Sequence, residues 1–376
     1  MTCDSPGHPA GSESGPTGDM HTMKKTRGAR PLAMALTFAC AFATVVSDTA
    51  SAEGRPAKEL FGGMALPAKA APSPYGSYAK GCIAGAVAIP TDGPTWQAMR
   101  LSRNRRWGHP EMITLLERFS KDAVQLGWGS GILIGDISQP RGGPMLSGHA
   151  SHQIGLDADI WFTPKPANAL SPQQREDLPF TSMLEKDKFL TVDKRLWTNT
   201  HARLVVQAAS YPQVERIFVN PAIKKKLCDT WTGDRAVLGK IRPIYGHDAH
   251  FHIRMRCPDG ASGCKPQAAV PPGDGCDQSL AWWFTKEPWA APKKDPNAKP
   301  APKPRAMQVA DLPKACALVL DARGPSSEYE VTYQAAGGSM PGSAASAFAA
   351  PPVATMVEPF ELPTIVPVPP ARPAGW

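Results

Sequence analysis

Five of the chain's nine histidines lie in two short segments that also contain aspartates. The segments read GHASHQIGLDADIWF and YGHDAHFHIRMRC. Their polar residues suited to metal or acid-base chemistry are His149, His152, Asp157, Asp159, His247, His250 and His252. Zinc prefers three or four nitrogen, oxygen or sulfur ligands, and a catalytic zinc keeps one position open for water. The residue types therefore indicate a zinc (Zn2+) site.

The alternation of polar and apolar residues predicts how these side chains converge. In LDADIWF, Asp157 and Asp159 would share one face of a strand. In HFHIRM, His250 and His252 would share a face in the same way. If the two strands are neighbours in one sheet, a carboxylate and two imidazoles meet, and His152 reaches them from the preceding loop. A lone His-x-His is usually a surface pair, but H-x6-D together with H-x-H predicts a metal site.

The same residues carry a resemblance to known proteins. H-x6-D with a distant H-x-H resembles the superfamily of lysostaphin-type peptidases, D-alanyl-D-alanine peptidases and the hedgehog zinc domain. The surrounding sequence resembles the penicillin-insensitive murein endopeptidases over residues 79–320, through GCIAGA, GHPEMI, LIGDISQPRGGP, GHASHQIGLDADIW, RIFVNPAIKKKLC and HFHIRMRCP. The dipeptidase pattern S-x-H-x-x-G-x-A-x-D differs at Ala150 and Asp157, which favours the endopeptidase branch.

The resemblance implies a role for each residue of the site. Four residues would serve as metal ligands: His149, His152, Asp159 and His252. His149 could instead orient a neighbouring ligand. His250 matches the family's candidate general base, His247 matches a further active-site histidine, and Asp157 would lie behind the ligands. A second zinc is not predicted, because EKDKFLTVDKRLW lacks the histidine of the family's Asp-x-x-His.

The resemblance also implies a reaction. Zinc-activated water would hydrolyse D-alanyl-meso-diaminopimelyl cross-links between peptidoglycan stem peptides, insensitive to penicillin. A zinc D,D-carboxypeptidase would share the site, and a non-catalytic wall-binding module would keep the ligands without the base. A serine D,D-peptidase is a further alternative, since Ser77 and Lys80 fit S-x-x-K and Ser102 and Asn104 fit S-x-N, but a K-T-G partner is missing.

An export signal is predicted at the N-terminal end. From Met23 the chain reads MKKTRGAR, then PLAMALTFACAFATVV, then DTASA, which is a basic, an apolar and a small-residue region in order. We expect a leader over 1–52, with the signal at about 23–52, and a periplasmic mature protein without an integral membrane segment, because the apolar run is too short.

The cysteines agree with export. Six remain after the leader, and an even number in an exported chain indicates disulfides, with fifteen possible connectivities. The family resemblance implies the pairs Cys82–Cys316, Cys228–Cys276 and Cys257–Cys264.

Hydrophobic patterns between residues 79 and 290 predict the elements that position the site. Helices are expected in HPEMITLLERFSKDAVQLG, LWTNTHARLVVQAASY and PAIKKKLCDTW, and strands in GSGILIGDIS and RIFVNP beside the two site segments. We therefore expect an α+β domain, stapled by disulfides, in which helices flank a small, mostly antiparallel sheet with the zinc site on one face. Trp282 and Trp283 are expected to pack in the core rather than stack on sugars.

Composition predicts the remaining segments. Residues 53–78 are rich in Ala, Pro, Gly and Ser and indicate a linker; residues 291–323 form a Pro/Lys tether ending at the Cys316 staple; residues 324–376 form a disordered tail. The net charge of +8 includes the leader and the tether. Because zinc-finger spacing and aromatic-basic stacking motifs are missing, no nucleic-acid partner is expected.

Overall fold

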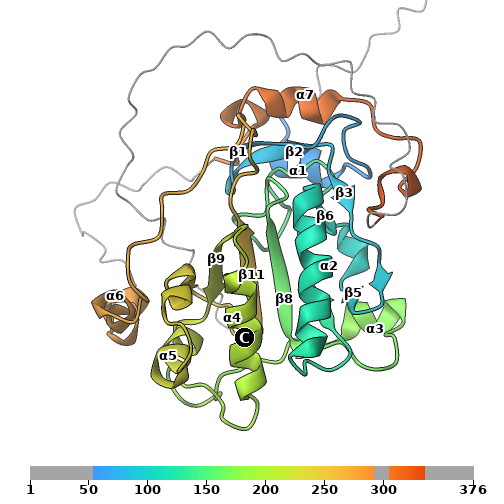
Figure 1. Cartoon of the computed structure of the whole chain (residues 1–376). Helices are drawn as coiled ribbons and strands as arrows, with labels where there is room; N and C mark the ends of the chain where they lie inside the picture. Colours follow the sequence, from blue (N-terminus) through green and yellow to red (C-terminus); the bar gives the residue numbers. More distant parts are fainter. Residues whose placement is uncertain (1–53, 292–304, 335–376) are drawn as a thin grey trace, which may run out of the picture. The chain divides into compact units, whose positions relative to one another are not determined.

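A seven-stranded sheet forms the centre of the protein in the computed structural model, which describes residues 54–291 and 305–334 (Figure 1). Its strands are β4 (Asp92–Gly93), β5 (Trp96–Ala98), β7 (Ile132–Ile134), β8 (Asp157–Pro164), β9 (Val214–Val219), β10 (Ile241–Pro243) and β11 (His250–Met255). Two small sheets pair β1 (Ser73–Ser77) with β2 (Lys80–Ala84), and β3 (Val87–Ala88) with β6 (Trp107–Gly108).

The strand order of the large sheet is β10-β9-β11-β8-β7-β5-β4. The pairs β10–β9 and β7–β5 are parallel, and the other four pairs are antiparallel. The predicted α+β class is confirmed, but the sheet is mixed and larger than expected. Sequence patterns miss β4, β5 and β10 because two or three residues are too few to show an alternation.

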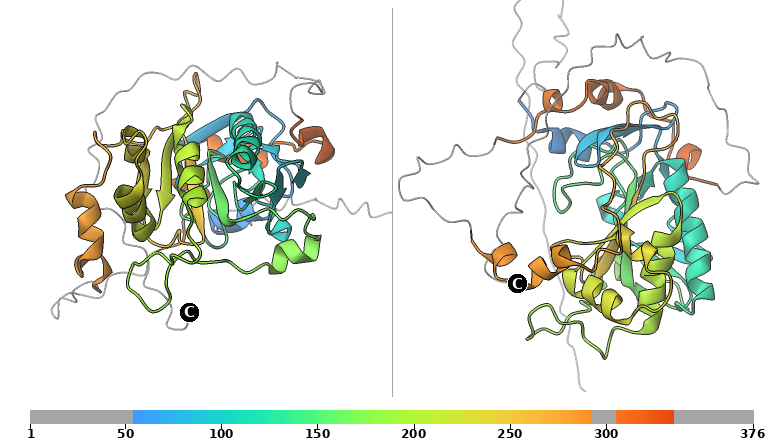
Figure 2. Two further views of the ribbon diagram at one scale, coloured as in Figure 1. Left: turned by 60° about the horizontal axis from the view of Figure 1, so that its bottom comes forward. Right: turned by 60° about the vertical axis from the view of Figure 1, so that its left-hand side comes forward.

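The three predicted helices correspond to α2 (Pro110–Gln125), α4 (Asn199–Ser210) and α5 (Pro221–Thr230). Helix α2 begins after His109, whose Nδ1 accepts the backbone N–H of Glu111, and has proline at its first position. It ends before Gly127, whose φ of +82° suits glycine. Helices α2 and α4 contact each other and cover one face of the sheet (Figure 2).

The core fills the space between this helix layer and the sheet. Phe251 of β11 packs against Phe119 of α2 with ring centroids 6.1 Å apart, and both are fully buried. Ala158 and Ile160 of β8, and Leu156 just before it, are fully buried in the same core. The alternation predicted for LDADIWF thus directs its apolar residues into the core, which leaves the other face of β8 for the aspartates.

The remaining helical elements are short. They are α1 (Ala57–Gly62), α3 (Pro172–Asp177), α6 (Gln278–Ala281) and α7 (Ala315–Asp321), with 3-10 turns η1 (Leu101–Arg103), η2 (Ala236–Lys240), η3 (Trp282–Phe284), η4 (Glu287–Trp289), η5 (Val309–Asp311) and η6 (Tyr329–Val331). None of the helices in the described ranges is long and apolar enough to cross a membrane.

All three implied disulfides are present. The Cα atoms are 5.6 Å apart for Cys82–Cys316, 5.7 Å for Cys228–Cys276 and 5.8 Å for Cys257–Cys264. The first joins β2 to α7 across 234 residues of sequence. Such long-range cross-links stabilise the folded state by about 2–4 kcal/mol, because they restrict the unfolded chain.

In place of the linker predicted over 53–78, the chain forms α1 and β1. Ala57 and Phe61 are fully buried in a cluster that contains Cys82 and Cys316. The disulfide brings α7 against β2 and thereby supplies apolar surface that composition does not reveal. Part of the predicted tether is folded for the same reason, since α7 lies within residues 291–323.

The first residues of the predicted tail are also folded. Tyr333 donates its backbone N–H to the carbonyl of Ala88, 2.8 Å away, and η6 precedes it. The leader at 1–52 with its export signal, residues 292–304 of the tether and residues 335–376 of the tail lie outside the described residues.

The start of α4 predicts a pH-dependent stability. Thr198 and His201 form a capping box in which His201 Nδ1 accepts the backbone N–H of Thr198, 3.2 Å away. Burial lowers the pKa of His201 to about 4. Between about pH 6.5 and pH 4 the unfolded chain therefore binds a proton here that the folded chain excludes. The free energy of unfolding falls as the pH is lowered through this window.

We expect His201→Gln to reduce this dependence by up to about 1.4 kcal/mol per pH unit, because glutamine caps the helix without titrating. Urea denaturation of the metal-free wild type and variant, at several pH values between 4 and 6.5, measures the two slopes. Equal slopes would show that His201 titrates alike in the folded and unfolded chain.

Candidate functional site

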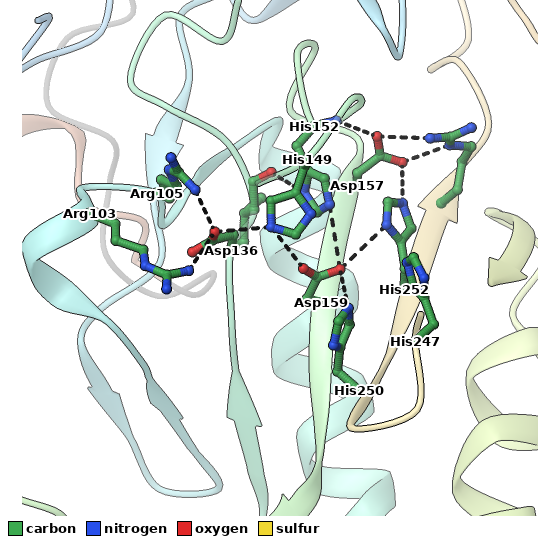
Figure 3. Close-up of polar contacts among 12 residues, drawn as sticks. Arg103, Arg105, Asp136, His149, His152, Asp157, Asp159, His247, His250 and His252 are labelled. Carbon is green, nitrogen blue, oxygen red and sulfur yellow. Dashed lines mark hydrogen bonds and ion pairs between the residues drawn. The ribbon is translucent and has the colours of Figure 1, made fainter. Parts of the chain in front are cut away.

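The pairing of β8 with β11 brings the two histidine-containing segments together. The strands are antiparallel, and their register places His252 opposite Asp159 and Arg254 opposite Asp157. His152 lies in the loop before β8, and His247 in the loop before β11. Asp159, His152 and His252 are each at most 3% exposed. The convergence predicted from the alternating strands is therefore present (Figure 3).

One carboxylate oxygen lies at the centre of this cluster. Asp159 Oδ1 is 3.5 Å from His152 Nε2, 3.4 Å from His252 Nδ1 and 3.7 Å from His250 Nε2. His149 Nε2 lies 3.4 Å from the other oxygen, Oδ2. Figure 3 shows the four imidazoles around Asp159. Ligand atoms of His149, His152 and Asp159 all lie within 4.8 Å of one another.

Several of these atoms have no hydrogen-bond partner. Asp159 Oδ1, His152 Nε2 and His250 Nε2 are buried and unpaired among the described residues. Buried polar atoms are normally satisfied, because leaving one unpaired costs about 1–3 kcal/mol. Nitrogen and oxygen atoms that converge in this way are a donor set that suits a zinc ion. The residues present could therefore hold a metal ion.

The loop before β8 fixes the orientation of His152. Its backbone adopts φ +66°, which is unusual for a residue other than glycine, and its N–H donates to Asp157 Oδ2, 2.9 Å away. Its ring lies with Nδ1 2.7 Å from the carbonyl oxygen of Ile137. Since a carbonyl only accepts, Nδ1 carries a proton, and Nε2 is the ring nitrogen that faces Asp159.

Asp157 orients the imidazole of His252 in the same way. His252 Nε2 donates to Asp157 Oδ1, 2.9 Å away, which leaves Nδ1 free to face Asp159. Arg254 binds the same carboxylate through Nε at 2.7 Å and Nη2 at 3.2 Å. Burial raises the pKa of Asp157, but Arg254 and His252 outweigh it and hold that pKa well below its usual range. Asp157 therefore remains ionised and fixes the tautomer of His252.

Arg254 was not identified from the sequence. Its guanidinium lies 4.1 Å from the ring centroid of Tyr78 and 4.9 Å from that of Phe218, and it is 7% exposed. The available signal was its position two residues after His252, which puts it on the same face of β11.

Asp136 is a second residue that sequence analysis missed. Its Oδ2 accepts hydrogen bonds from His149 Nε2 at 3.1 Å, Arg105 Nη1 at 2.9 Å and Arg103 Nη1 at 3.2 Å. Burial raises its pKa, but His149 and Arg105 outweigh burial and lower the pKa to about 2. An ionised Asp136 thus holds His149 beside Asp159. Asp136 follows β7. Its place beside the cluster therefore depends on the pairing of β7 with β8, which the sequence alone does not show.

Electrostatics at the centre favour a positive charge. Burial raises the pKa of Asp159, but His250 and His152 hold it well below its usual range. Burial lowers the pKa of His152, but Asp159 raises it to about 9. For His252, burial dominates and lowers the pKa to about 3. The site therefore accommodates one cationic charge next to an ionised Asp159.

His250 and His247 lie at the open side of the cluster. The side chain of His250 is 21% exposed, and its ring centroid is 4.9 Å from that of His247. His247 Nδ1 donates to the carbonyl of Tyr245, 2.8 Å away, so its Nε2 is left as an acceptor. Burial lowers the pKa of His247 to about 4. Both imidazoles are thus only partly buried, although the His250 Nε2 atom itself is buried.

The residues of the serine alternative have other contacts. Ser102 donates through its backbone N–H and its hydroxyl to Glu176, at 2.9 Å in both cases. Asn104 donates to the carbonyl of Ala65. Ser77 and Lys80 face each other across the β1–β2 turn. Ser102 and Asn104 therefore have structural partners, so the S-x-N half of the serine alternative loses its support.

Known proteins resemble this chain over the part that contains the site. The family model for penicillin-insensitive murein endopeptidases matches residues 74–321, which include the four histidine-bearing positions around Asp159 and all three disulfides. A protein of that name from Haemophilus influenzae is 49% identical over 215 residues, which are 56% of this chain and 73% of the relative.

Relatives with the same name give longer alignments. The protein from Klebsiella pneumoniae is 39% identical over 246 residues, covering 65% of this chain and 85% of its own length. The protein from Salmonella heidelberg is 40% identical over 255 residues, which cover 68% of this chain and 88% of the relative. The similarity thus extends over the folded part of the chain.

Proposed function

The chain belongs to the penicillin-insensitive murein endopeptidase family, and on this premise we propose that it is a zinc-dependent endopeptidase of peptidoglycan. The bond it cleaves is the D-alanyl-meso-diaminopimelyl cross-link between stem peptides, and its compartment is the periplasm. The observation that carries the zinc assignment is the set of unpaired buried atoms around Asp159. A binding module would not need the partly exposed His250 beside them.

Within this proposal, His152, Asp159 and His252 hold the zinc. His149 either completes the set or, while its Nε2–H is donated to Asp136, orients Asp159 from 3.4 Å away. Asp157 and the carbonyl of Ile137 fix the tautomers of His252 and His152. When bound, zinc lowers the pKa of a water ligand to about 7 and polarises the scissile carbonyl.

The proton transfers are assigned to the histidines at the open side. His250 accepts a proton at Nε2 from the attacking water and returns it to the amide nitrogen that leaves as an amine. The acyl half leaves as a carboxylic acid that ionises. His247 keeps an acceptor nitrogen beside His250 because its Nδ1–H is bound to Tyr245. No bond forms between the substrate and the protein, so a β-lactam has no acyl acceptor to block.

Digestion of purified cross-linked muropeptide dimers, read by mass spectrometry, tests this function. We expect conversion of dimers to monomers that a chelator stops, that added zinc restores and that penicillin leaves unchanged. Release of terminal D-alanine alone would indicate a carboxypeptidase. Zinc binding without any conversion would indicate a binding module. Inhibition by penicillin would indicate a serine D,D-peptidase.

A further inference from the structure

Five aromatic side chains form a cluster that the proposed reaction does not use. We call it the aromatic platform; its members are Phe189, Tyr245, Trp282, Trp283 and Trp289. Trp289 is the common neighbour, with ring centroids 5.6 Å from Phe189, 5.0 Å from Tyr245 and 6.2 Å from Trp283. Trp282 lies 5.3 Å from Trp283, which lies 4.8 Å from Tyr245.

The platform reaches the surface. Phe189 is 61% exposed, Trp289 38% and Trp282 36%, while Trp283 and Tyr245 are half-buried beneath them. The expectation that Trp282 packs in the core is therefore wrong: it lies in a short turn after α6, outside the space between the sheet and α2. Exposed aromatic groups of this size commonly mark binding surfaces.

Hydrogen bonds keep the platform in place without burying it. The indole N–H of Trp289 donates to the carbonyl of Trp283, 2.8 Å away, and the hydroxyl of Tyr245 donates to the carbonyl of Pro288. The disulfide Cys228–Cys276 holds the preceding segment against α5. The rings are thus ordered before any ligand arrives, which lowers the entropic cost of binding.

The platform is continuous with the candidate active site. The carbonyl of Tyr245 accepts the hydrogen bond of His247, and His247 contacts His250. Phe189 comes from a second segment, a loop at residues 183–193 that is tied to the same region because Met183 donates its N–H to the carbonyl of Asp248, 2.8 Å away. The Tyr245–His247 segment therefore links the platform to His250.

We propose that the aromatic platform binds the sugar rings of the glycan strand to which the cleaved stem peptide is attached. This inference rests on the proposed function, since murein stem peptides are covalently linked to an amino-sugar strand. Sugar rings present apolar C–H faces with a rim of hydroxyl groups. Trp and Tyr match that surface, because they combine a flat apolar ring with one polar group.

Two substrates separate this role from catalysis. One is the cross-linked muropeptide dimer with its disaccharides, and the other is the same peptide dimer with its sugars removed. Wild type should have the higher kcat/KM for the sugar-bearing dimer. Phe189→Ala and Trp282→Ala, in the two separate segments, should each lower that preference about tenfold through KM, because they remove a ligand contact.

A matched control comes from another exposed aromatic residue. Tyr329 is 76% exposed and lies in η6, on the opposite side of the folded unit from α6 (Figure 1). Tyr329→Ala should keep the wild-type preference. The platform is not a sugar site if Phe189→Ala and Trp282→Ala lower kcat/KM by the same factor for both dimers, or if they leave both values at the wild-type level.

A direct binding measurement distinguishes this inference from the endopeptidase proposal. We expect the sugar-only disaccharide to change the tryptophan fluorescence of the full chain saturably, and Phe189→Ala to weaken that binding. If wild type cleaves neither dimer but binds the disaccharide, the endopeptidase proposal fails and the platform stands. If a synthetic peptide of residues 359–370 (PFELPTIVPVPP) binds and the disaccharide does not, the platform serves this chain's own tail and the proposal is wrong.

Discussion

Asp159→Asn should abolish both metal retention and cleavage of cross-linked dimers. Asp159 is 3% exposed, and its Oδ1 is the atom on which His152, His250 and His252 converge. Asparagine keeps the size of the side chain but removes the charge that favours a cation there. Since zinc supplies several kcal/mol of transition-state stabilisation, activity should fall by more than about a thousandfold.

Metal content after dialysis and the rate of dimer cleavage measure the two effects together. Asp122→Asn is the control, because Asp122 lies on α2, away from the site, and accepts a hydrogen bond from Tyr211. The control should keep its zinc and its activity. A variant at Asp159 that binds one zinc per chain as tightly as wild type would show that another set of residues holds the metal.

His250→Ala should remove activity while most of the zinc remains. The imidazole is 21% exposed and 3.7 Å from Asp159, farther than His152 and His252 are. It starts β11, where truncation disturbs no core contact. A general acid-base group contributes about a hundred- to ten-thousandfold, and we expect a loss in kcat of that size.

The same two measurements distinguish the possible roles of His250. Loss of zinc in His250→Ala would make His250 a ligand, and normal cleavage would show that the base assignment is wrong. His201→Gln provides a histidine control, because His201 caps α4 and lies outside the site. That variant should retain zinc and cleave dimers at the wild-type rate near neutral pH.

Much of the fold follows from local patterns. The alternation in LDADIWF and HFHIRM predicts strands, and β8 and β11 are found there with Asp157 and Asp159 on one face. Helical spacing, a proline start and a glycine stop predict α2. These patterns suffice because each depends on the geometry of one segment alone. Such patterns do not predict the short strands, α1 or the exposure of Trp282. These features depend on contacts with segments that are distant in the sequence.

The sequence alone therefore determined which residues could do chemistry and which face of each strand they occupy. The tertiary structure decided which side chains these residues contact. The register of β11 against β8 sets His252 opposite Asp159, and the neighbouring β7 adds Asp136 beside His149. Residue order does not encode such distances directly, because strand pairing and side-chain hydrogen bonds depend on the packing of the whole core.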